Sequence, residues 1–384
     1  MRAIKPFTFH RPALAESYCD SLEGLGLADS RSGLFLAAPR RTGKSTFLRE
    51  DMLPAMQKRG WTTIYVDLWA DKSKDPALLM TSAVKAKIAT FAGVIAKMAK
   101  ASGLEKVNVF GALSLNLDSL ELPTGLTLAD ALEALVQAGK APVAIVIDEA
   151  QHALSTQAGV DAMFALKAAR DHLNQGAEQQ GLFIVLTGSN RDKLAHLVLK
   201  RTQPFFGSQV TRFPLLTKEF TDAYTDFLNP LLANDNQFSH EEVFEAFKLV
   251  GHRPELLRSI VGEIALDAGA EHLGEALKNG AEEIKERMWA AMESEFAGLP
   301  DIQRAVLDTI IAQGRNFVPF SEASMRAYAD LVQQERVSVP SVQAALDTLR
   351  EKGLVWRAAY GEYALEDESM ASWYKSKMKR QGSA

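Results

Sequence analysis

Residues 34–48 constrain the fold of this chain more than any other stretch. They form an apolar run, a short loop and the start of a helical pattern. The loop ends in Gly43-Lys44-Ser45, the end of the phosphate-binding pattern Gly-x-x-x-x-Gly-Lys-Ser/Thr, while Ala38 stands where the pattern has its first glycine. A glycine lets the backbone approach an anion, and a helix that begins there points free N–H groups at it. The stretch therefore predicts a strand, a phosphate-binding loop (P-loop) and a helix.

The polar side chains of this loop suit a nucleoside triphosphate and its metal ion. Lys44 can reach the β- and γ-phosphates, and the hydroxyl of Ser45 can ligate Mg²⁺. Ala38 needs an ordinary negative φ, which suits a loop stiffened by Pro39. The same residues also allow a plain strand-to-helix turn with a solvated lysine, so the rest of the chain has to decide.

A second stretch, residues 142–150, supports the nucleotide site. Five consecutive apolar residues, 143–147, indicate a strand buried on both faces, as in parallel sheets. Asp148 and Glu149 follow at its carboxyl end, where open α/β sheets place their ligands. We expect Asp148 to hold Mg²⁺ and Glu149 to orient and deprotonate the attacking water, as in a Walker B motif. An acidic N-cap is the alternative, which a P-loop about a hundred residues earlier makes less attractive.

Three further strands complete a predicted α/β core. They are Thr62–Leu68, Leu182–Ser189 and Gln209–Leu215. Asn190 directly follows the second of these, so its side chain can hold the catalytic water and sense the γ-phosphate. It is also a good helix N-cap, and the two roles are compatible.

Composition limits the class of protein. A chain of 384 residues, 47% apolar and 24% charged, is typical of a soluble globular protein with two or three domains. Its net charge of −5 argues against coating nucleic acid by bulk electrostatics, although a local basic site stays open. The single Cys19 excludes a disulfide framework, and no signal peptide or long apolar run is visible. We therefore expect a cytoplasmic protein with no membrane partner.

Helical patterns surround the strands and dominate the second half of the chain. In the first half, helices are predicted over Ala13–Leu25 (closed by Gly26), Ser45–Lys58, Pro76–Lys100, Leu128–Gln137 and Arg191–Lys200, with a strand or hairpin over Lys106–Asp118. An all-α lid is predicted from Lys218–Leu232, Ser239–Val250, a helix opening at Pro254, and residues 271–298. A winged helix-turn-helix is predicted from Ile302–Ala312, Ser321–Val332, Val342–Lys352 and strands at 353–356 and Glu362–Leu365. The expected boundaries are 1–32 for a lead-in, 33–216 for the core, 217–298 for the lid and 299–384 for the winged helix.

Four motifs resemble the AAA+ superfamily, in the branch shared by archaeal-type and STAND ATPases and the origin-recognition initiators. They are Pro39-Arg40-Arg41-Thr42-Gly43-Lys44-Ser45-Thr46, Ile147–Gln151, Thr187–Asn190 and Gly251–Pro254. The resemblance implies a parallel sheet in the order 5-1-4-3-2 and an ATP site between sheet and lid, with the first motif around ATP. It also implies self-association through the ATPase core, because a neighbouring subunit often completes such sites.

The resemblance assigns further roles to polar residues. Sensor 1 maps to Asn190, with Ser189 as the alternative, and sensor 2 maps to Arg253, with Arg258 second. The arginine finger maps to Arg201, with Arg212 second, although a cation at a helix C-terminus is an equally good interpretation of Arg201. The archaeal-type family often has Gly-Arg after an aromatic pair, whereas this chain has Phe205-Phe206-Gly207-Ser208.

The leading functional hypothesis is a Mg²⁺-dependent ATPase that acts as a nucleotide-controlled switch and recruits or remodels a partner. One alternative is a DNA-binding ATPase of the initiator or transposition-regulator type, which the winged helix favours. Charge does not favour it, because residues 301–384 contain eleven acids and eleven bases. The other alternative is a slow or non-hydrolysing STAND-like scaffold in defence or signalling.

Overall fold

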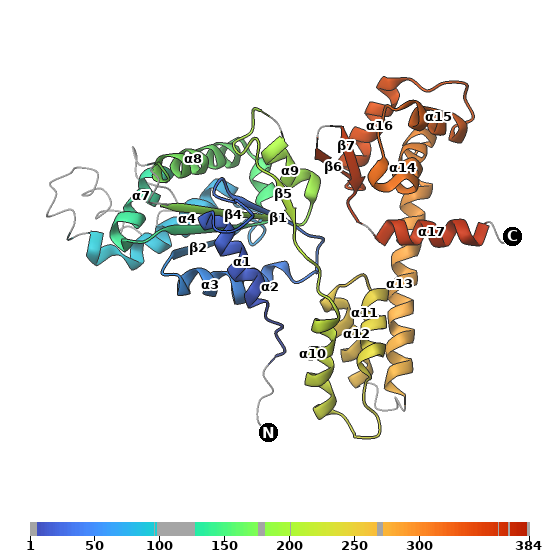
Figure 1. The fold of residues 1–384 in the computed structure, drawn as a ribbon, viewed down its shortest axis with the longest axis horizontal. Coiled ribbons are helices and arrows are strands. Elements are labelled where there is room, and N and C mark those ends of the chain that lie inside the picture. The colour runs from blue at the N-terminus through green and yellow to red at the C-terminus, as the bar shows by residue number, and fades with distance from the viewer. Residues whose placement is uncertain are drawn as a thin grey trace. The chain divides into compact units, whose positions relative to one another are not determined.

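The computed structural model describes residues 6–381 other than 96, 98–126, 176–180, 200, 267–271, 360 and 368. The chain forms two compact units (Figure 1). The core unit contains His10–Ala37 and Ser45–Phe213, and the C-terminal unit contains the N-terminal segment to Phe9, the loop Ala38–Lys44 and Pro214–Ala384. The strand or hairpin predicted over Lys106–Asp118 lies outside the described residues.

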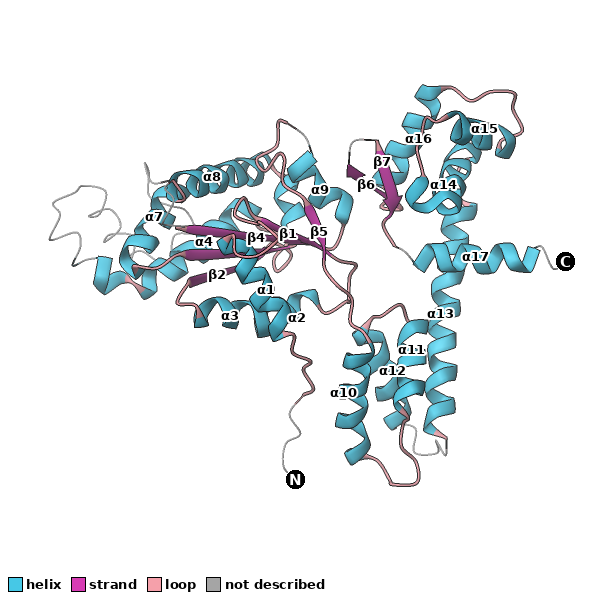
Figure 2. Cartoon of the chain, viewed as in Figure 1, coloured by secondary structure: helices cyan, strands magenta, loops and turns pink. Residues whose placement is uncertain are grey.

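A five-stranded parallel sheet forms the centre of the core unit (Figure 2). The strands are β1 (Leu34–Ala37), β2 (Thr62–Asp67), β3 (Val143–Asp148), β4 (Leu182–Gly188) and β5 (Val210–Arg212), in the order β2-β3-β4-β1-β5. This is the predicted order read from the opposite edge, so the predicted parallel α/β sheet is confirmed. Every residue of β1, β3 and β4 is buried, as their uninterrupted apolar runs indicated.

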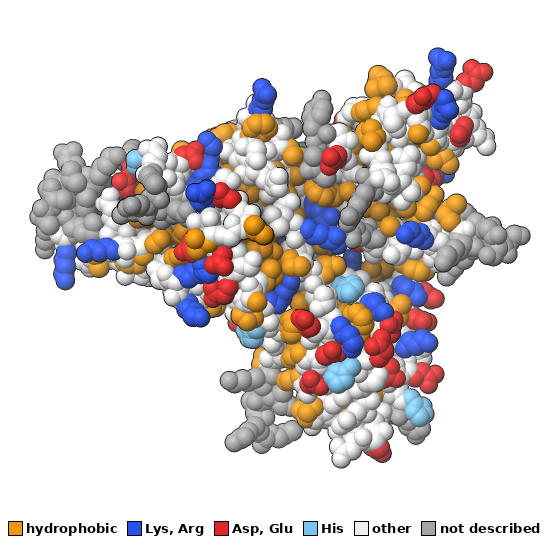
Figure 3. Space-filling view, in the orientation of Figure 1, with side chains coloured by type: hydrophobic (Ala, Val, Ile, Leu, Met, Phe, Trp, Pro, Cys, Tyr) orange, Lys and Arg blue, Asp and Glu red, His pale blue; other side chains and the backbone are white. Residues whose placement is uncertain are grey.

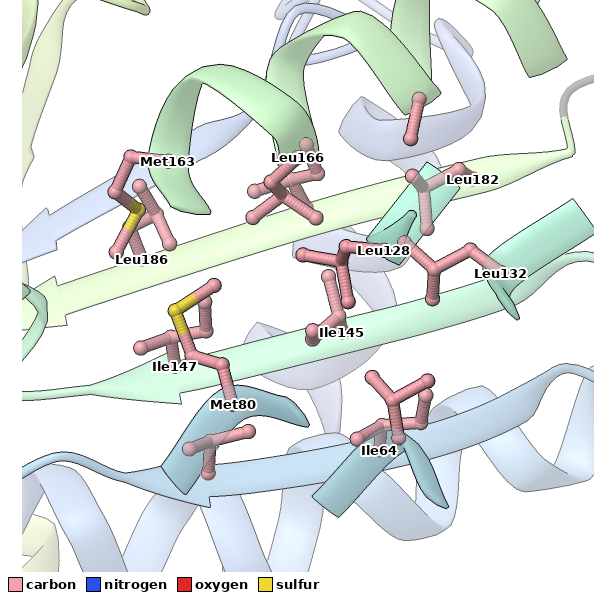
Figure 4. Close-up of a cluster of buried hydrophobic side chains, with 14 of the residues drawn as sticks. Ile64, Met80, Leu128, Leu132, Ile145, Ile147, Met163, Leu166, Leu182 and Leu186 are labelled. Carbon is pink, nitrogen blue, oxygen red and sulfur yellow. The ribbon is translucent and has the colours of Figure 1, made fainter. Parts of the chain in front are cut away.

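Helices cover both faces of this sheet. On one face lie α4 (Pro76–Thr90), α7 (Leu128–Gly139) and α8 (Gln157–Leu173). Figure 4 shows how their side chains meet those of the strands. The strands contribute Ile64, Ile145, Ile147, Leu182 and Leu186, and the helices contribute Met80, Leu128, Leu132, Met163 and Leu166. Burying each of these side chains contributes about 1.5–3 kcal/mol, which fixes the position of the strand ends.

Two helices next to the sheet depart from the predicted boundaries. The helix predicted over Ser45–Lys58 is present as α2 (Lys44–Phe47) and α3 (Leu53–Lys58), separated by a wider π-helical turn at Leu48–Met52. Pro54 explains the turn, because its nitrogen has no hydrogen to donate to the preceding turn. Helix α1 (Pro12–Glu23) ends two residues earlier than predicted, at Gly24, whose φ of 73° suits glycine.

Four helices form the first part of the C-terminal unit, as predicted for the lid. They are α10 (Lys218–Leu228), α11 (His240–Leu249), α12 (Pro254–Leu266) and α13 (Leu273–Ala297). Phe7 and Phe9 of the N-terminal segment pack against Phe220 of α10, with ring centroids 6.1 and 5.7 Å away. The N-terminal segment therefore belongs to the hydrophobic cluster of the lid.

The rest of this unit has the element order of a winged helix. Helices α14 (Asp301–Gln313), α15 (Glu322–Leu331) and α16 (Val339–Glu351) precede an antiparallel hairpin of β6 (Val355–Ala359) and β7 (Glu362–Leu365). Helix α16 begins three residues before the predicted Val342, because the Ser338 side chain accepts a hydrogen bond from the backbone of Ser341 and so caps it. A last helix, α17 (Ser369–Gln381), was not predicted.

Helix α13 is common to the lid helices and to the part that follows them. Leu273, Leu277 and Ala281 belong to the hydrophobic cluster of the lid, whereas Phe296 belongs to the cluster around α14 and α16. The two parts are therefore joined by one uninterrupted helix of 25 residues. Within the described part of the chain, none of the helices is both long enough and apolar enough to cross a membrane.

Candidate nucleotide-binding site

The loop between β1 and α2 has the backbone conformation of an anion-binding loop. Arg41 and Gly43 both have left-handed φ values, 66° and 87°, and such alternation turns backbone N–H groups towards one side. Thr42 is buried and donates a hydrogen bond to the carbonyl of Pro39 (2.8 Å), which closes the loop. Ala38 is buried and has no positive φ, so an alanine fits where the common pattern has glycine.

The remaining residues of the predicted loop differ in exposure. Lys44 is the first residue of α2 and is only 5% exposed. Arg40 and Thr46 are exposed. Arg41 is also exposed, and its Nε lies 3.4 Å from Oε2 of Glu255 in the first turn of α12.

The metal-ligating residues predicted from the sequence lie together. Ser45 Oγ donates a hydrogen bond to Asp148 Oδ2 at 2.6 Å, although 103 residues separate them in the chain. Asp148 is only 1% exposed, and a buried carboxylate requires such partners. Thr187 Oγ1 and the backbone N–H of Glu149 both donate to its other oxygen, Oδ1. Three neighbouring segments of the core unit therefore fix the orientation of this carboxylate.

Tyr65 is a member of this group that sequence reasoning missed. Its hydroxyl donates to Asp148 Oδ2 at 3.2 Å. Tyr65 pairs with Val146 in the sheet, two residues before Asp148, so the side chains of Tyr65 and Asp148 lie on the same face. The long tyrosine side chain spans these two residues and reaches the carboxylate. Burial and the neighbouring Asp148 charge raise the pKa of Tyr65, which keeps its hydroxyl protonated as a donor. The alternation of side chains along β2 was the only signal for it in the sequence.

The oxygen atoms at this point fit a magnesium ion. Mg²⁺ prefers oxygen ligands at about 2.0–2.1 Å in octahedral geometry, which places adjacent ligands roughly 2.9 Å apart. Ser45 Oγ and Asp148 Oδ2 are 2.6 Å apart. Small displacements would therefore let both oxygens, directly or through water, face one Mg²⁺.

Glu149 adopts an unusual backbone conformation at the end of β3. Its φ of 55° and ψ of 40° are left-handed, which costs a residue with a side chain about 1–2 kcal/mol. Its Oε2 accepts hydrogen bonds from Ser189 Oγ (2.7 Å) and Gln151 Nε2 (2.5 Å). The carboxylate predicted to be the catalytic base is therefore hydrogen-bonded to Ser189, directly after β4.

The two sensor 1 candidates occupy different positions. Ser189, the alternative, contacts Glu149 as described above. Asn190, the first choice, accepts a hydrogen bond from the backbone N–H of Lys193 (2.7 Å) and caps α9 (Arg191–Leu199). The structure thus brings Ser189 to the Walker B residues, and Asn190 has the capping role that was its alternative.

The predicted arginines belong to both units, Arg201 and Arg212 to the core unit and Arg253 and Arg258 to the C-terminal unit. Arg253 Nη2 donates to Asp367 Oδ2 at 2.8 Å, a partner that the sequence did not suggest. Arg258 is exposed on α12. Arg201, two residues beyond α9, and Arg212, on β5, are exposed as well.

Comparison with known proteins agrees with this geometry. Residues 28–197, which contain the P-loop, Asp148, Glu149 and Ser189, match a family model described as an AAA domain. This segment is therefore similar to an AAA domain. A search of curated proteins found no match to the chain.

Solved structures share the fold over nearly the whole chain. A Walker-type ATPase of Pyrococcus abyssi has 20% sequence identity and a TM-score of 0.51, with 96% of each chain covered. The ORC2 protein of Aeropyrum pernix, in an ADP form, has 16% identity and a TM-score of 0.55, with 98% of this chain and 97% of that chain covered. The predicted resemblance is confirmed at the level of fold: the chain shares the fold of these two proteins over nearly its whole length.

Proposed function

We propose that this chain is an AAA+ ATPase: it binds ATP with Mg²⁺, hydrolyses it, and uses the nucleotide state as a switch to recruit or remodel a partner. The observation that carries the proposal is the contact of Ser45 with Asp148, beside a Glu149 held at the end of β4. Ser45, Asp148 and Glu149 lie together at the carboxyl edge of the sheet, where open α/β sheets bind their ligands, which supports metal binding and base catalysis there.

The individual roles follow from the chemistry of the side chains. The backbone of the loop 39–46 surrounds the phosphates, and the Lys44 ammonium offsets their charge. Ser45 and Asp148 hold Mg²⁺, which supplies charge neutralisation at the phosphates. Glu149 accepts a proton from the attacking water. Ser189 orients Glu149.

The arginines support two further parts of the proposal. Arg201 is exposed beyond α9, which suits a finger that acts in the site of a neighbouring copy. Arg253 precedes the first turn of α12 and is the proposed sensor 2 residue. The proposed assembly is therefore a self-associating ATPase.

Two substitutions test the ATPase proposal. In Lys44→Ala, ATP affinity measured by calorimetry should fall strongly, because a phosphate-binding cation is lost. In Glu149→Gln, ATP should still bind while phosphate release slows by about 10²–10⁴-fold, the usual contribution of a general base. The exposed Lys58→Ala and Glu50→Gln provide matched controls.

For each of these measurements, one outcome would refute the role proposed for a residue. Wild-type affinity in Lys44→Ala would contradict the P-loop assignment. Equal turnover in Glu149→Gln and wild type would show that Glu149 is not the base. ATP binding without turnover in wild type would favour the scaffold hypothesis instead.

The surface of α16 favours a protein partner over DNA. DNA backbone contacts need free Lys or Arg side chains. The exposed side of α16 carries Asp347 and Glu351, and Arg350 is only 14% exposed and lies 3.3 Å from Asp347. Acidic and basic side chains are also interspersed on the face of the molecule shown in Figure 3.

A mobility-shift assay with duplex DNA at low salt separates the two partners. We expect no shift. A salt-sensitive shift that disappears when Lys375, Lys379 and Arg380 are replaced by glutamine would favour the DNA-binding alternative.

A further inference from the structure

Gln151, two residues after Glu149, is buried against the end of β4. It is 6% exposed, and its Nε2 donates to Glu149 Oε2 at 2.5 Å. The same Nε2 lies 3.5 Å from Ser189 Oγ, which donates to the same carboxylate oxygen at 2.7 Å. We propose that Gln151 is a positioning residue for the catalytic base: with Ser189 it holds the Glu149 carboxylate in the orientation that accepts the proton of the attacking water. This inference rests on the proposed ATPase function.

The orientation of the Gln151 amide follows from the chemistry of its neighbour. An ionised carboxylate only accepts hydrogen bonds, so the amide nitrogen must face Glu149 and the amide oxygen must face away. Within the described residues, that oxygen, Oε1, is buried without a hydrogen-bond partner. A buried unpaired oxygen is unfavourable, and an apolar side chain of the same length would avoid it. Packing alone therefore does not explain a glutamine at this position, whereas its N–H donors do.

Gly188 provides the space that this orientation needs. A Cβ at position 188 would lie 2.6 Å from Gln151 Oε1 and 3.3 Å from the Cβ of Leu194. Gly188 does not have a positive φ, so its backbone conformation does not require glycine. The requirement for glycine comes from the Gln151 amide.

Three consecutive residues at the end of β4 thus contact or make room for the contacts of the two acids at the end of β3, Asp148 and Glu149. Thr187 donates to Asp148, Gly188 accommodates the amide that donates to Glu149, and Ser189 donates to Glu149 directly. The left-handed backbone of Glu149 begins the 3₁₀ turn Ala150–Ser155, which brings the side chain of residue 151 back to that of residue 149. A glutamate side chain has several rotatable bonds, and donors on one oxygen select one rotamer before the substrate arrives.

Gln151→Met is the central test, because methionine keeps the length of the side chain and removes its donors. We expect kcat for ATP hydrolysis to fall about 10–100-fold while the affinity for ATP and KM stay within about twofold. The melting temperature should stay equal or rise, because the unpaired oxygen is removed. Gln157→Met is the matched control, since Gln157 is exposed on α8 and its amide donates to Asp161 in the same helix.

Two double variants test whether Gln151 acts through Glu149. In a Glu149→Gln background, adding Gln151→Met should change kcat by less than about twofold, because the group it positions is already lost. Gly188→Ala should lower kcat by displacing the amide, and Gln151→Met should add little to it. If kcat of either double variant falls by the product of the two single-variant losses, the proposal is overturned. An unchanged kcat in Gln151→Met would overturn it as well.

A spectroscopic measurement is independent of turnover. In protein labelled with ¹⁵N-glutamine, the side-chain amide of Gln151 is assigned by its disappearance in Gln151→Met. Its proton resonance should move in Glu149→Gln and stay in place in Glu50→Gln. An unchanged resonance in Glu149→Gln would refute the contact even in an active enzyme. If the wild type binds ATP but does not hydrolyse it, the proposed function fails, and a resonance that still moves would leave Gln151 as a structural partner of Glu149 only.

Discussion

The buried hydrogen bond between Thr187 and Asp148 gives the sharpest prediction about stability. Thr187 is 0% exposed and Asp148 is 1% exposed. The Thr187 hydroxyl donates to Asp148 Oδ1. Valine has the shape of threonine with a methyl group in place of the hydroxyl. Thr187→Val therefore removes one donor from a buried carboxylate while it keeps the shape of the side chain.

The expected cost follows from the surroundings of the carboxylate. A hydrogen bond to a charged group contributes about 1.5–3 kcal/mol. Ser45, Tyr65 and the backbone N–H of Glu149 also donate to Asp148, so the carboxylate keeps other partners. We therefore expect the lower part of that range, about 1.5–2 kcal/mol. A domain of this size loses about 2–4 °C of melting temperature per kcal/mol, which predicts a fall of about 3–8 °C.

Scanning calorimetry of the full chain without nucleotide measures this fall. Thr187→Ser keeps the hydroxyl and should lose less than Thr187→Val. Thr81→Val is the control for the substitution itself, because its hydroxyl donates only to the carbonyl of Ala77 in its own helix, at 2.7 Å. The reasoning would be refuted if Thr187→Val had the melting temperature of the wild type. It would also be refuted if Thr187→Ser lowered the melting temperature as much as Thr187→Val.

Two further predictions concern α1 and its neighbours. Burial raises the pKa of the Cys19 thiol to about 12 from 9.0. The unfolded chain then loses this proton first, so the free energy of unfolding should fall between about pH 9 and 12, by up to ~1.4 kcal/mol per pH unit. Urea denaturation at pH 8, 9 and 10 should show this extra slope in wild type and not in Cys19→Ala; parallel slopes would contradict it. Arg59 bonds to Glu16, Asp20 and Glu23 on one side of α1. Arg59→Met should cost about 1–2 kcal/mol at low salt, and clearly less at 1 M salt or when the three acids are made neutral; a cost independent of both would show that packing is responsible.

The parts of the site predicted from the sequence are those whose chemistry is local. The glycine and lysine of the P-loop, and the two acids after an apolar run, sit at fixed distances from a strand end. The sheet order then brings Ser45 to Asp148 without any further information. The same reasoning gave the five strands, because long apolar runs have few alternatives in a parallel sheet.

The parts that were missed depend on how separate segments meet. Ser189 and Asn190 are adjacent polar residues, and only the geometry at the end of β4 decides which of them reaches Glu149. Tyr65 depends on the register of β2 against β3. The bond of Arg253 to Asp367 joins residues 114 positions apart, on elements whose packing no local pattern specifies.

The uninterrupted course of α13 has a mechanical consequence. A helix of 25 residues is about 37 Å long. Its first turns are packed among the lid helices and its last turns among α14 and α16. An α-helix resists bending because every turn is hydrogen-bonded to the next. A tilt of about 10° imposed on the lid end would therefore carry the far end through roughly 6 Å, with the helix length as the lever arm. Small tilts of the lid helices can in this way become displacements as large as a helix pitch around α14 and α16.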